Sequence, residues 1–286
     1  MTQYDRLAVL GHPAAHSLSP VMHRAAYQAL GLTATYTAID VVPNDLLRVL
    51  QSINKQGYRG VNLTIPHKEV ALPFMKQCSS RAKRIGAVNT VTCLDGQLYG
   101  DNTDGEGWLS SFTMETGADV NGLHVVVIGA GGAARAIVDA LLSNGCEHVT
   151  LVNRTLDRAN QLQEAFQAYY DIAKLSTCSL ECVDLFDADL VVNTTAVGLA
   201  GKLQDQLPVS LSTLRMGTIV SDIVYRPRQT KFLQEAHARG ASIHEGIGML
   251  VHQGALAIQQ WFDVLAPIEV MRTAVCDVLD GSKGGQ

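Results

Sequence analysis

Four short polar clusters in the amino-terminal part of the chain have side chains suited to proton transfer and to binding a small hydroxylated anion. Hydroxyls and amides can bind hydroxyls or a carboxylate, and one Lys with one Asp can transfer a proton. Each cluster follows a stretch expected to be a strand, and ligands of open α/β sheets bind beyond the carboxyl ends of strands. We therefore expect one shared site. The clusters are HSLSP with Ser17 and Ser19, NLTIPHK with Asn62, Thr64 and Lys68, AVNT with Asn89, and GDNTD with Asp104.

Each of these residues also has a purely structural interpretation. Ser19 is expected to cap a helix that has Pro20 at its first position, and Ser17 also suits a turn. Lys68 falls in the first turn of a helix, where the dipole disfavours a cation; this favours a function, although solvated lysines are common. Asp104 also suits a cap for the helix that follows it. The predicted site therefore depends on the clusters occurring together.

A glycine-rich segment, VVVIGAGGAARAIVDALL, predicts a dinucleotide site. It places Gly129-x-Gly131-x-x-Ala134 between a strand and a helix, which is the context that the pyrophosphate-binding turn requires. The expected loop consists of Gly129, Ala130, Gly131, Gly132 and Ala133. A glycine turn that serves packing alone is the alternative.

The end of the next strand favours NADP over NAD. An NAD site usually has Asp or Glu about twenty residues after the glycines. Here the sequence reads Asn153-Arg154-Thr155, with Arg158 one turn further. Guanidiniums and a hydroxyl suit a 2′-phosphate, which a carboxylate would repel. The alternative is that Arg154 and Arg158 only form a solvated helix face.

Alternating strands and helices must position these residues, and they predict an α/β protein of two domains. The expected strands are 6–10, 35–40 and 60–63, a hairpin of 88–94 and 97–100 around Asp95-Gly96, and then 125–128, 149–152, 190–193 and 218–221. The expected helices include 20–30, 44–56, one opening at Pro66, 104–115, 246–262 and 268–279. We predict an amino-terminal three-layer α/β domain with a mostly parallel sheet over residues 1–110, and a Rossmann-like NADP-binding domain over 111–248.

Composition excludes several classes of protein. The 286 residues have 47% hydrophobic and 17% charged side chains, typical of a globular protein, and a net charge of -5, which disfavours a nucleic-acid partner. The six cysteines form no CxxC pair and the histidines no HExxH motif, so we predict no metal site. The sequence indicates neither a signal peptide nor a membrane span, and a cytoplasmic protein is expected. It does not choose between a monomer and a homodimer.

Eight motifs, in order along the whole chain, resemble the shikimate dehydrogenase family, including its quinate/shikimate relatives. The motifs are HSLSPVMH, GVNLTIPHK, GAVNT, GDNTDGEG, GAGGAARA, NRTLDRA, DIVYRPRQTKFL and GIGMLVHQGALAIQQW. The resemblance implies reversible NADPH-dependent reduction of 3-dehydroshikimate to shikimate, in chorismate and aromatic amino-acid biosynthesis. It also implies that carboxyl-terminal helices, residues 249–286, complete the first domain.

The resemblance further implies roles for individual residues. Lys68 and Asp104 match the catalytic pair, and Ser17 and Ser19, with Tyr225, match the site for the substrate carboxylate. Thr64, Asn89, Asp104 and Gln253 would hold the ring hydroxyls, supported by Asn62. Ile223 and Gly246 match the nicotinamide side, and we also expect Thr194 to contact the cofactor. One departure is Arg24, which follows His23 where the family usually has Asn.

Two other functions are compatible with these residues. The chain could be a paralogue that acts on quinate or a related hydroxy acid, which the change at Arg24 motivates. It could also be a non-catalytic sensor of a dinucleotide or a metabolite. A sensor would be free to lose the proton-transfer pair, and both Lys68 and Asp104 are present.

Overall fold

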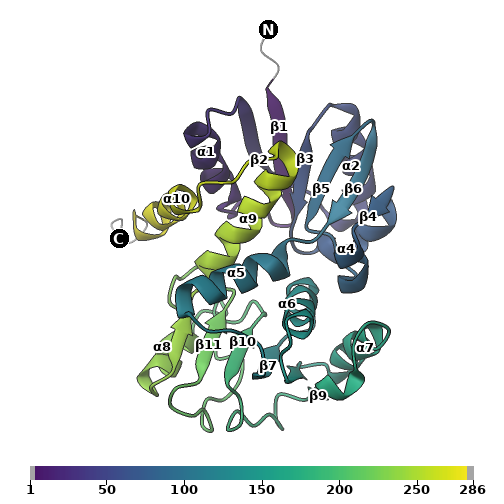
Figure 1. Ribbon diagram of the computed structural model, residues 1–286. Helices are drawn as coiled ribbons and strands as arrows, with labels where there is room; N and C mark the ends of the chain where they lie inside the picture. Colours follow the sequence, from purple (N-terminus) through teal and green to yellow (C-terminus); the bar gives the residue numbers. More distant parts are fainter. Residues whose placement is uncertain (1–3, 282–286) are drawn as a thin grey trace. The chain divides into compact units, whose positions relative to one another are not determined.

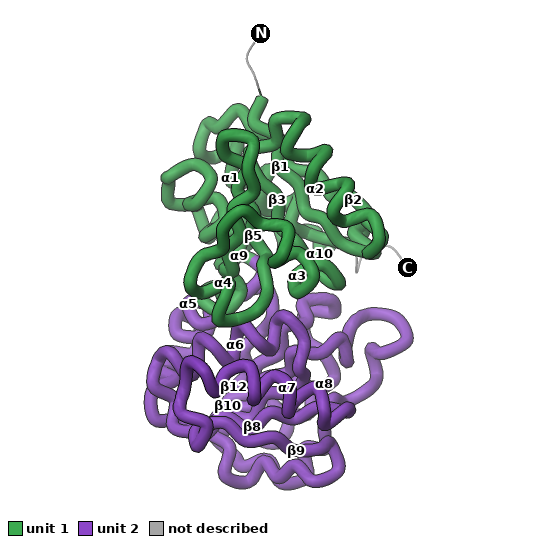
Figure 2. Tube along the Cα trace, turned by 90° about the vertical axis from the view of Figure 1, so that its right-hand side faces the viewer, with its two compact units in different colours: residues 1–107, 251–286 green, residues 108–250 purple. Residues whose placement is uncertain are grey.

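The computed structural model describes residues 4–281 and divides them into two compact units, coloured separately in Figure 2. Unit 1 takes the described residues up to Gly107 and those from Val251 onward, and unit 2 takes Trp108–Leu250. The chain passes between the units within helix α5 (Asp104–Thr116) and again within helix α9 (Gly246–Phe262), both labelled in Figure 1. The boundaries expected from the sequence lie after residues 110 and 248.

Unit 1 is built on a six-stranded mixed sheet of order β2-β1-β3-β5-β6-β4. β1 pairs in parallel with β2 and β3, and β4 with β6, whereas β3–β5 and β5–β6 are antiparallel. The hairpin turn has Asp95 and Gly96 at φ 50° and 70°, the left-handed pair of a type I′ turn. The strands are β1 (Asp5–Gly11), β2 (Ala34–Asp40), β3 (Gly60–Leu63), β4 (Gln77–Cys78), β5 (Thr90–Leu94) and β6 (Gln97–Asp101).

Helices cover both faces of this sheet, as expected for a three-layer unit. Leu50 and Ile53 of α2 share a core with Ala8 and Val61 of the strands. On the other side α1 packs against α10, and Trp261 of α9 donates to the carbonyl of Val91 at 3.1 Å. The helices are α1 (Ser19–Ala29), α2 (Leu46–Lys55), α3 (His67–Val70), α4 (Ser80–Ile85) and α10 (Ile268–Gly281), with short 3-10 turns at Pro43–Asp45 and Leu72–Phe74.

Unit 2 contains a six-stranded parallel sheet of order β12-β11-β10-β7-β8-β9. Counted along the chain, this is the 3-2-1-4-5-6 order of doubly wound dinucleotide-binding folds. The strands are β7 (His124–Ile128), β8 (His148–Val152), β9 (Leu175–Cys178), β10 (Leu190–Asn193), β11 (Ile219–Asp222) and β12 (Ser242–His244). Between them lie α6 (Gly132–Ser143), α7 (Leu156–Phe166), a 3-10 turn (Ile172–Lys174) and α8 (Lys231–Ala238).

Alternate residues of the central strand β7 face two separate cores. Val125 and Val127 pack with residues of α5, α6 and α7, whereas Val126 and Ile128 pack with residues of α8 and of the loops on either side of β10, such as Leu185 and Leu211. Strands covered on both faces are nearly continuous runs of apolar residues, which is why HVVVI forms the middle of a parallel sheet. Within residues 4–281, no helix is long and apolar enough to cross a bilayer.

Candidate active site

Lys68 and Asp104 of unit 1 form a close ion pair. Lys68 is the second residue of α3, and Asp104 is the first residue of α5. The Nζ atom of Lys68 donates to Oδ2 of Asp104 at 2.7 Å, and only 3% of the Asp104 side chain is exposed against 16% for Lys68. A carboxylate fixed by burial thus holds a lysine amine at the edge of solvent, an arrangement suited to delivering a proton.

Asn89 holds the other oxygen of the Asp104 carboxylate. Its Nδ2 donates to Oδ1 of Asp104 at 2.9 Å and to Oγ1 of Thr103 at 2.9 Å. Its Oδ1 accepts from the backbone N–H of Thr103 at 2.8 Å, which fixes the orientation of the amide. Gln253 of α9 joins this group through its Oε1, 3.4 Å from the Asn89 amide, and its carbonyl accepts from Thr103 at 3.1 Å. Asn89, Asp104 and Gln253 are therefore together in unit 1.

Asn62 lies beneath this group, with 5% of its surface exposed. Its Nδ2 donates to the carbonyl of Asn89 and to Oγ1 of Thr90, both at 3.1 Å. Its Oδ1 accepts from the hydroxyl of Tyr36 at 2.7 Å. These three hydrogen bonds are all made to protein groups, which is compatible with a supporting role.

The serine cluster differs from the sequence prediction in one respect. Ser19 does not cap α1: the helix begins at Ser19 itself, its N-cap is Leu18, and no side chain caps it. Instead the backbone N–H of Ser19 donates to Oγ of Ser17 at 3.3 Å, and the Ser19 side chain hydrogen-bonds with Tyr36. Packing of the buried Ser19 against β2 therefore outweighs its capping propensity. Arg24, the departure from the family pattern, is exposed on α1.

Thr64 sits in the tight segment between β3 and α3. Its backbone N–H donates to the carbonyl of Leu10 at 2.9 Å, and its carbonyl accepts from the N–H of His67 at 2.8 Å. The buried His67 bonds the carbonyl of Val41 through Nε2 at 2.8 Å. Burial lowers the pKa of His67, so it is neutral and donates this bond. The segment that carries Thr64 and Lys68 is thus anchored to the ends of β1 and β2.

Sequence reasoning did not single out two buried residues that hold this site together. Thr103 fixes the Asn89 amide, and Tyr36 fixes the Asn62 amide. Thr103 lies inside the GDNTD cluster, so its neighbours were a usable signal. Tyr36 gave no such signal, because its partner is 26 residues away in the chain.

In unit 2 the glycine loop has the geometry that a pyrophosphate needs. Gly129 has φ +116°, and a Cβ on it would lie 2.4 Å from Oγ1 of Thr194, so only glycine fits. A Cβ on Gly131 would meet no atom within 4 Å, so the loop has open space on that side. Gly131 is the N-cap of α6 and supplies no side-chain cap, which leaves the first N–H groups of the twelve-residue helix available to an anion. Ala130 and Ala133 are half-buried, and Ala134 is fully buried against the sheet.

The segment after β8 presents two exposed cations. The side chain of Asn153 donates to the carbonyl of Thr155 at 2.8 Å and shapes the turn before α7. Arg154, Thr155 and Arg158 are exposed, and within residues 4–281 neither guanidinium has a carboxylate partner. Thr155 is the N-cap of α7 without a side-chain bond. These groups fit the 2′-phosphate of NADP, because unpaired guanidiniums bind such an oxyanion well.

The other predicted cofactor residues follow the central strands of unit 2. Thr194, after β10, donates through Oγ1 to the carbonyl of Ile128 at 2.7 Å. Ile223, after β11, donates its N–H to the carbonyl of Asn193 at 3.1 Å. A Cβ on Gly246 would lie 2.5 Å from the carbonyl oxygen of Ile223, so the first residue of α9 packs closely against that carbonyl and leaves no room for a side chain. Tyr225, predicted to bind substrate, lies in the same loop of unit 2 and is half-buried.

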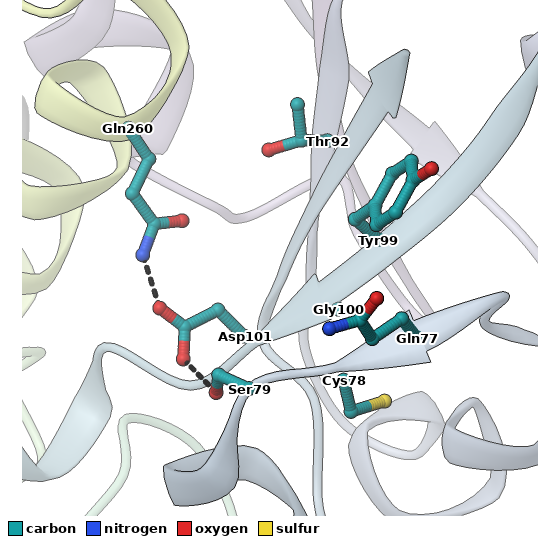
Figure 3. A pocket seen from close by; sticks show the side chains of 8 residues that line it. All are labelled: Gln77, Cys78, Ser79, Thr92, Tyr99, Gly100, Asp101 and Gln260. Atoms are coloured by element: carbon teal, nitrogen blue, oxygen red, sulfur yellow. Dashed lines mark hydrogen bonds between the residues drawn. The ribbon is translucent and has the colours of Figure 1, made fainter. Parts of the chain in front are cut away.

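A second polar region of unit 1 lies beside β4 and β6 (Figure 3). The carboxylate of Asp101 accepts from Ser79 and Gln260, as Figure 3 shows, and from Arg81 at 2.7 Å. The Asp101 carboxylate is thus already hydrogen-bonded to protein groups on both of its oxygens. It is open, has a volume of about 440 Å³, and is lined by Gln77, Cys78, Ser79, Thr92, Tyr99, Gly100, Asp101 and Gln260.

Three family models match the chain in succession. A model described as the shikimate dehydrogenase substrate binding domain matches residues 9–91. A model for shikimate / quinate 5-dehydrogenase matches residues 112–206, and one for the shikimate 5′-dehydrogenase C-terminal domain matches residues 246–276. The first match contains Lys68 and Asn89, and the second contains the glycine loop.

Whole proteins are also similar over nearly their full length. A shikimate dehydrogenase (NADP(+)) of Geobacillus kaustophilus is 41% identical over 275 residues, which are 95% of this chain and 97% of that protein. The solved structure of shikimate 5-dehydrogenase from Thermus thermophilus, in complex with NADP(H) and shikimate, has a TM-score of 0.87 at 41% identity and covers 96% of this chain and 100% of that one. A 5-ketofructose reductase of a Gluconobacter strain has a TM-score of 0.87 at 31% identity, with 97% and 100% covered.

Proposed function

Because this chain belongs to the shikimate dehydrogenase family, we propose that it catalyses the reversible NADPH-dependent reduction of 3-dehydroshikimate to shikimate. The reaction is a step of chorismate and aromatic amino-acid biosynthesis. The observation that carries the proposal is the contact between Nζ of Lys68 and Oδ2 of Asp104 at 2.7 Å, with Asn89 on the other carboxylate oxygen. A sensor of metabolites would not need this pair.

Lys68 is the proposed proton donor. NADPH, when bound, supplies a hydride to the ketone carbon, and the oxygen then needs a proton. The ammonium of Lys68 can donate that proton, and its amine can take it back when the acid is oxidised. Asp104 keeps the amine in place, because both of its oxygens accept hydrogen bonds and its side chain is buried.

The remaining polar groups of unit 1 suit the carboxylate and hydroxyls of the acid. Ser17 and Ser19 are proposed to bind the carboxylate, and Tyr225 is also proposed to bind the substrate. Thr64, Asn89 and Gln253 are proposed to bind the ring hydroxyls. A site built to bond hydroxyl groups rejects analogues that lack them, because its own buried polar groups are then left unpaired. Asn62, whose bonds are made to the protein, supports Asn89 from below.

We further propose that unit 2 is the NADP-binding Rossmann domain and that unit 1, completed by the carboxyl-terminal helices, is the substrate-binding and catalytic domain. The glycine loop and the exposed Arg154 and Arg158 support the first assignment. The ion pair and its amides support the second. The six cysteines are free thiols, which suits the cytoplasm as the place of action. A monomer or a homodimer is compatible with this function.

Initial rates of oxidation of shikimate and of quinate, each with NADP+ and with NAD+, test the proposal. We expect shikimate with NADP+ to give the highest kcat/KM of the four combinations. The reason is the proposed hydroxyl-binding site of unit 1 together with the two exposed guanidiniums of Arg154 and Arg158.

Other patterns among the four rates would contradict different parts of the proposal. Faster oxidation of quinate would assign the chain to a related acid instead, and a clear preference for NAD+ would contradict the role of Arg154 and Arg158. Absence of turnover with all four combinations would contradict the proposed reaction itself. Fructose, tested with both cofactors, checks for an activity like that of the structurally similar ketofructose reductase.

A further inference from the structure

Asp222 is a buried carboxylate of unit 2 that the proposed chemistry does not use. It is the last residue of β11, and its side chain has no exposed surface. Its Oδ1 accepts from Nδ2 of Asn193 at 2.9 Å and from the backbone N–H of Val224 at 3.0 Å, and its Oδ2 accepts from Oγ1 of Thr230 at 2.7 Å. All three donors are uncharged. Because burial of a charge is costly, the position indicates a need for hydrogen-bonding groups at both ends of the side chain.

The three donors belong to three different segments. Asn193 is the last residue of β10 and lies opposite Asp222 in the register of the sheet. Val224 lies in the loop after β11. Thr230 is the N-cap of α8, where its Oγ1 also accepts from the N–H of Leu233 at 3.3 Å. One carboxylate therefore ties together a neighbouring strand end, the loop that follows its own strand, and the start of a helix.

The same segments carry the residues proposed to meet the nicotinamide end of the cofactor. The Oδ1 atom of Asn193 accepts from the N–H of Thr195 at 3.0 Å and from its Oγ1 at 2.7 Å, so it shapes the turn that holds Thr194. The carbonyl of Asn193 accepts from the N–H of Ile223 at 3.1 Å. A shift of Asn193 or of Val224 would therefore displace Thr194 and Ile223 together.

We propose that Asp222 is a positioning residue for the proposed reaction: it holds the loops after β10 and β11 so that Thr194 and Ile223 meet the nicotinamide half of NADP. The inference rests on the proposed function, since those contacts are part of it. Asp222 acts through Asn193 and Val224 and touches neither ligand. Its role is to hold these partners in a fixed geometry. In Asp222→Asn the amide oxygen can still accept from Asn193 and Val224, and the NH2 group can donate to Oγ1 of Thr230, because a hydroxyl both donates and accepts. The isosteric amide should therefore preserve most of this role.

The test compares Asp222→Ala with Asp222→Asn. Titrations give the Kd for NADP+ and for adenosine 2′,5′-bisphosphate, which has the 2′-phosphate but lacks the nicotinamide. For Asp222→Ala we expect the Kd of NADP+ to rise roughly tenfold or more, as when buried hydrogen bonds are broken, and kcat for shikimate oxidation to fall. The Kd of the bisphosphate should stay within about twofold. Asp222→Asn should stay within about threefold of the wild type in all three measurements.

Three further variants distinguish a positioning role of Asp222 from a general loss of stability of unit 2. Thr230→Val removes the bond to Oδ2 and should weaken NADP+ binding, whereas Thr230→Ser keeps the hydroxyl and should not. Val191→Ala, a core substitution within β10, lowers stability without contacting the loops and should leave both Kd values unchanged. If Asp222→Ala fails to fold, the two Thr230 variants carry the test.

The outcomes for the inference and for the proposed function are distinct. Wild-type affinity for NADP+ in both Asp222→Ala and Thr230→Val would overturn the inference, as would equal weakening of NADP+ and the bisphosphate. A wild-type protein that binds no NADP+, or that does not oxidise shikimate, would instead overturn the proposed function.

Discussion

At the scale of single residues, the proposed chemistry depends on Lys68. Replacing it with alanine removes the proton donor but leaves the buried polar groups beneath it. We expect kcat for shikimate oxidation in Lys68→Ala to fall by about 10²–10⁴-fold, the usual contribution of a general acid–base group. Binding of NADP+ should not change, because the glycine loop lies in unit 2. Steady-state rates and a cofactor titration on the same sample give both quantities.

A matched control separates proton transfer from loss of charge. Lys76→Ala removes an exposed lysine of unit 1, so its rate should equal that of the wild type. A Lys68→Ala enzyme with an unchanged kcat would show that Lys68 has been assigned the wrong role. Lys68→Arg keeps the charge, but its guanidinium is a far poorer proton donor, so it should also be slow.

At the scale of elements, the turn between β7 and α6 contains two glycines with different requirements. Gly129 needs a positive φ and has no room for a Cβ, so Gly129→Ala should lower the free energy of unfolding by about 1–3 kcal/mol and also weaken NADP+ binding. Gly131 has open space around it, so Gly131→Ala should leave the free energy of unfolding unchanged and weaken only the binding of NADP+. Urea unfolding and NADP+ titration distinguish the two variants.

Two results would contradict the predicted difference between Gly129 and Gly131. If Gly131→Ala binds NADP+ as tightly as the wild type, no pyrophosphate approaches the backbone at that position. If it destabilises unit 2 as much as Gly129→Ala, the open space beside Gly131 is not available to a side chain.

Elements with strong local signals were predictable from the sequence, and those set by tertiary contacts were not. Helix α9 has the predicted bounds, because an apolar helical pattern follows a glycine start. The strands β4, β9 and β12 were not predicted. β4 and β12 have only two and three residues, and β9, with the sequence LSTC, lacks the apolar run that marks the equally short β10. The capping role of Ser19 was a local inference and is wrong, because contacts with β2 decide where its side chain points.

The same distinction applies to the candidate site. Lys68, Asn89 and Asp104 were predicted together, because each follows a strand and the carboxyl ends of such strands tend to meet. The bonds that orient them could not be predicted. The Asn62 amide depends on Tyr36 and the Asn89 amide on Thr103, and these contacts exist only after the chain has folded. A pattern of residue types indicates a site but not the direction of its hydrogen bonds.

At the scale of the whole molecule, each unit contains one tryptophan, which allows unit 2 to be observed alone. Trp108 belongs to unit 2, has no exposed surface, and donates through Nε1 to Oγ of Ser221 at 3.1 Å. Trp261 belongs to unit 1. In a Trp261→Phe background, tryptophan fluorescence therefore reports the unfolding of the unit that contains Asp222.

Asp222 makes the stability of that unit depend on pH. Burial raises the pKa of its carboxyl from 3.8 to about 6, against the hydrogen bonds from Thr230, Val224 and Asn193, which lower it. The folded state therefore binds the proton more tightly than the unfolded state between these two values. Stability from this group is greatest below pH 3.8 and is lost as the pH rises to about 6. Each pKa unit corresponds to about 1.36 kcal/mol, so the total is on the order of 3 kcal/mol.

We therefore expect Asp222→Asn to gain about 2 kcal/mol of stability relative to its Asp222 parent as the pH rises from 4 to 7, since part of the total is already lost at pH 4. The amide has no charge to desolvate, so only the parent loses stability in this range. Urea unfolding of both proteins, followed by Trp108 fluorescence at intervals of half a pH unit, gives the difference between their free energies of unfolding. Contributions of the other titrating groups, which the two proteins share, cancel in this difference. Asp157→Asn, on the exposed surface of α7, is the control and should stay within about 0.5 kcal/mol of the parent. A difference that is constant with pH would mean that the Asp222 carboxyl does not titrate in the folded protein between pH 4 and 7.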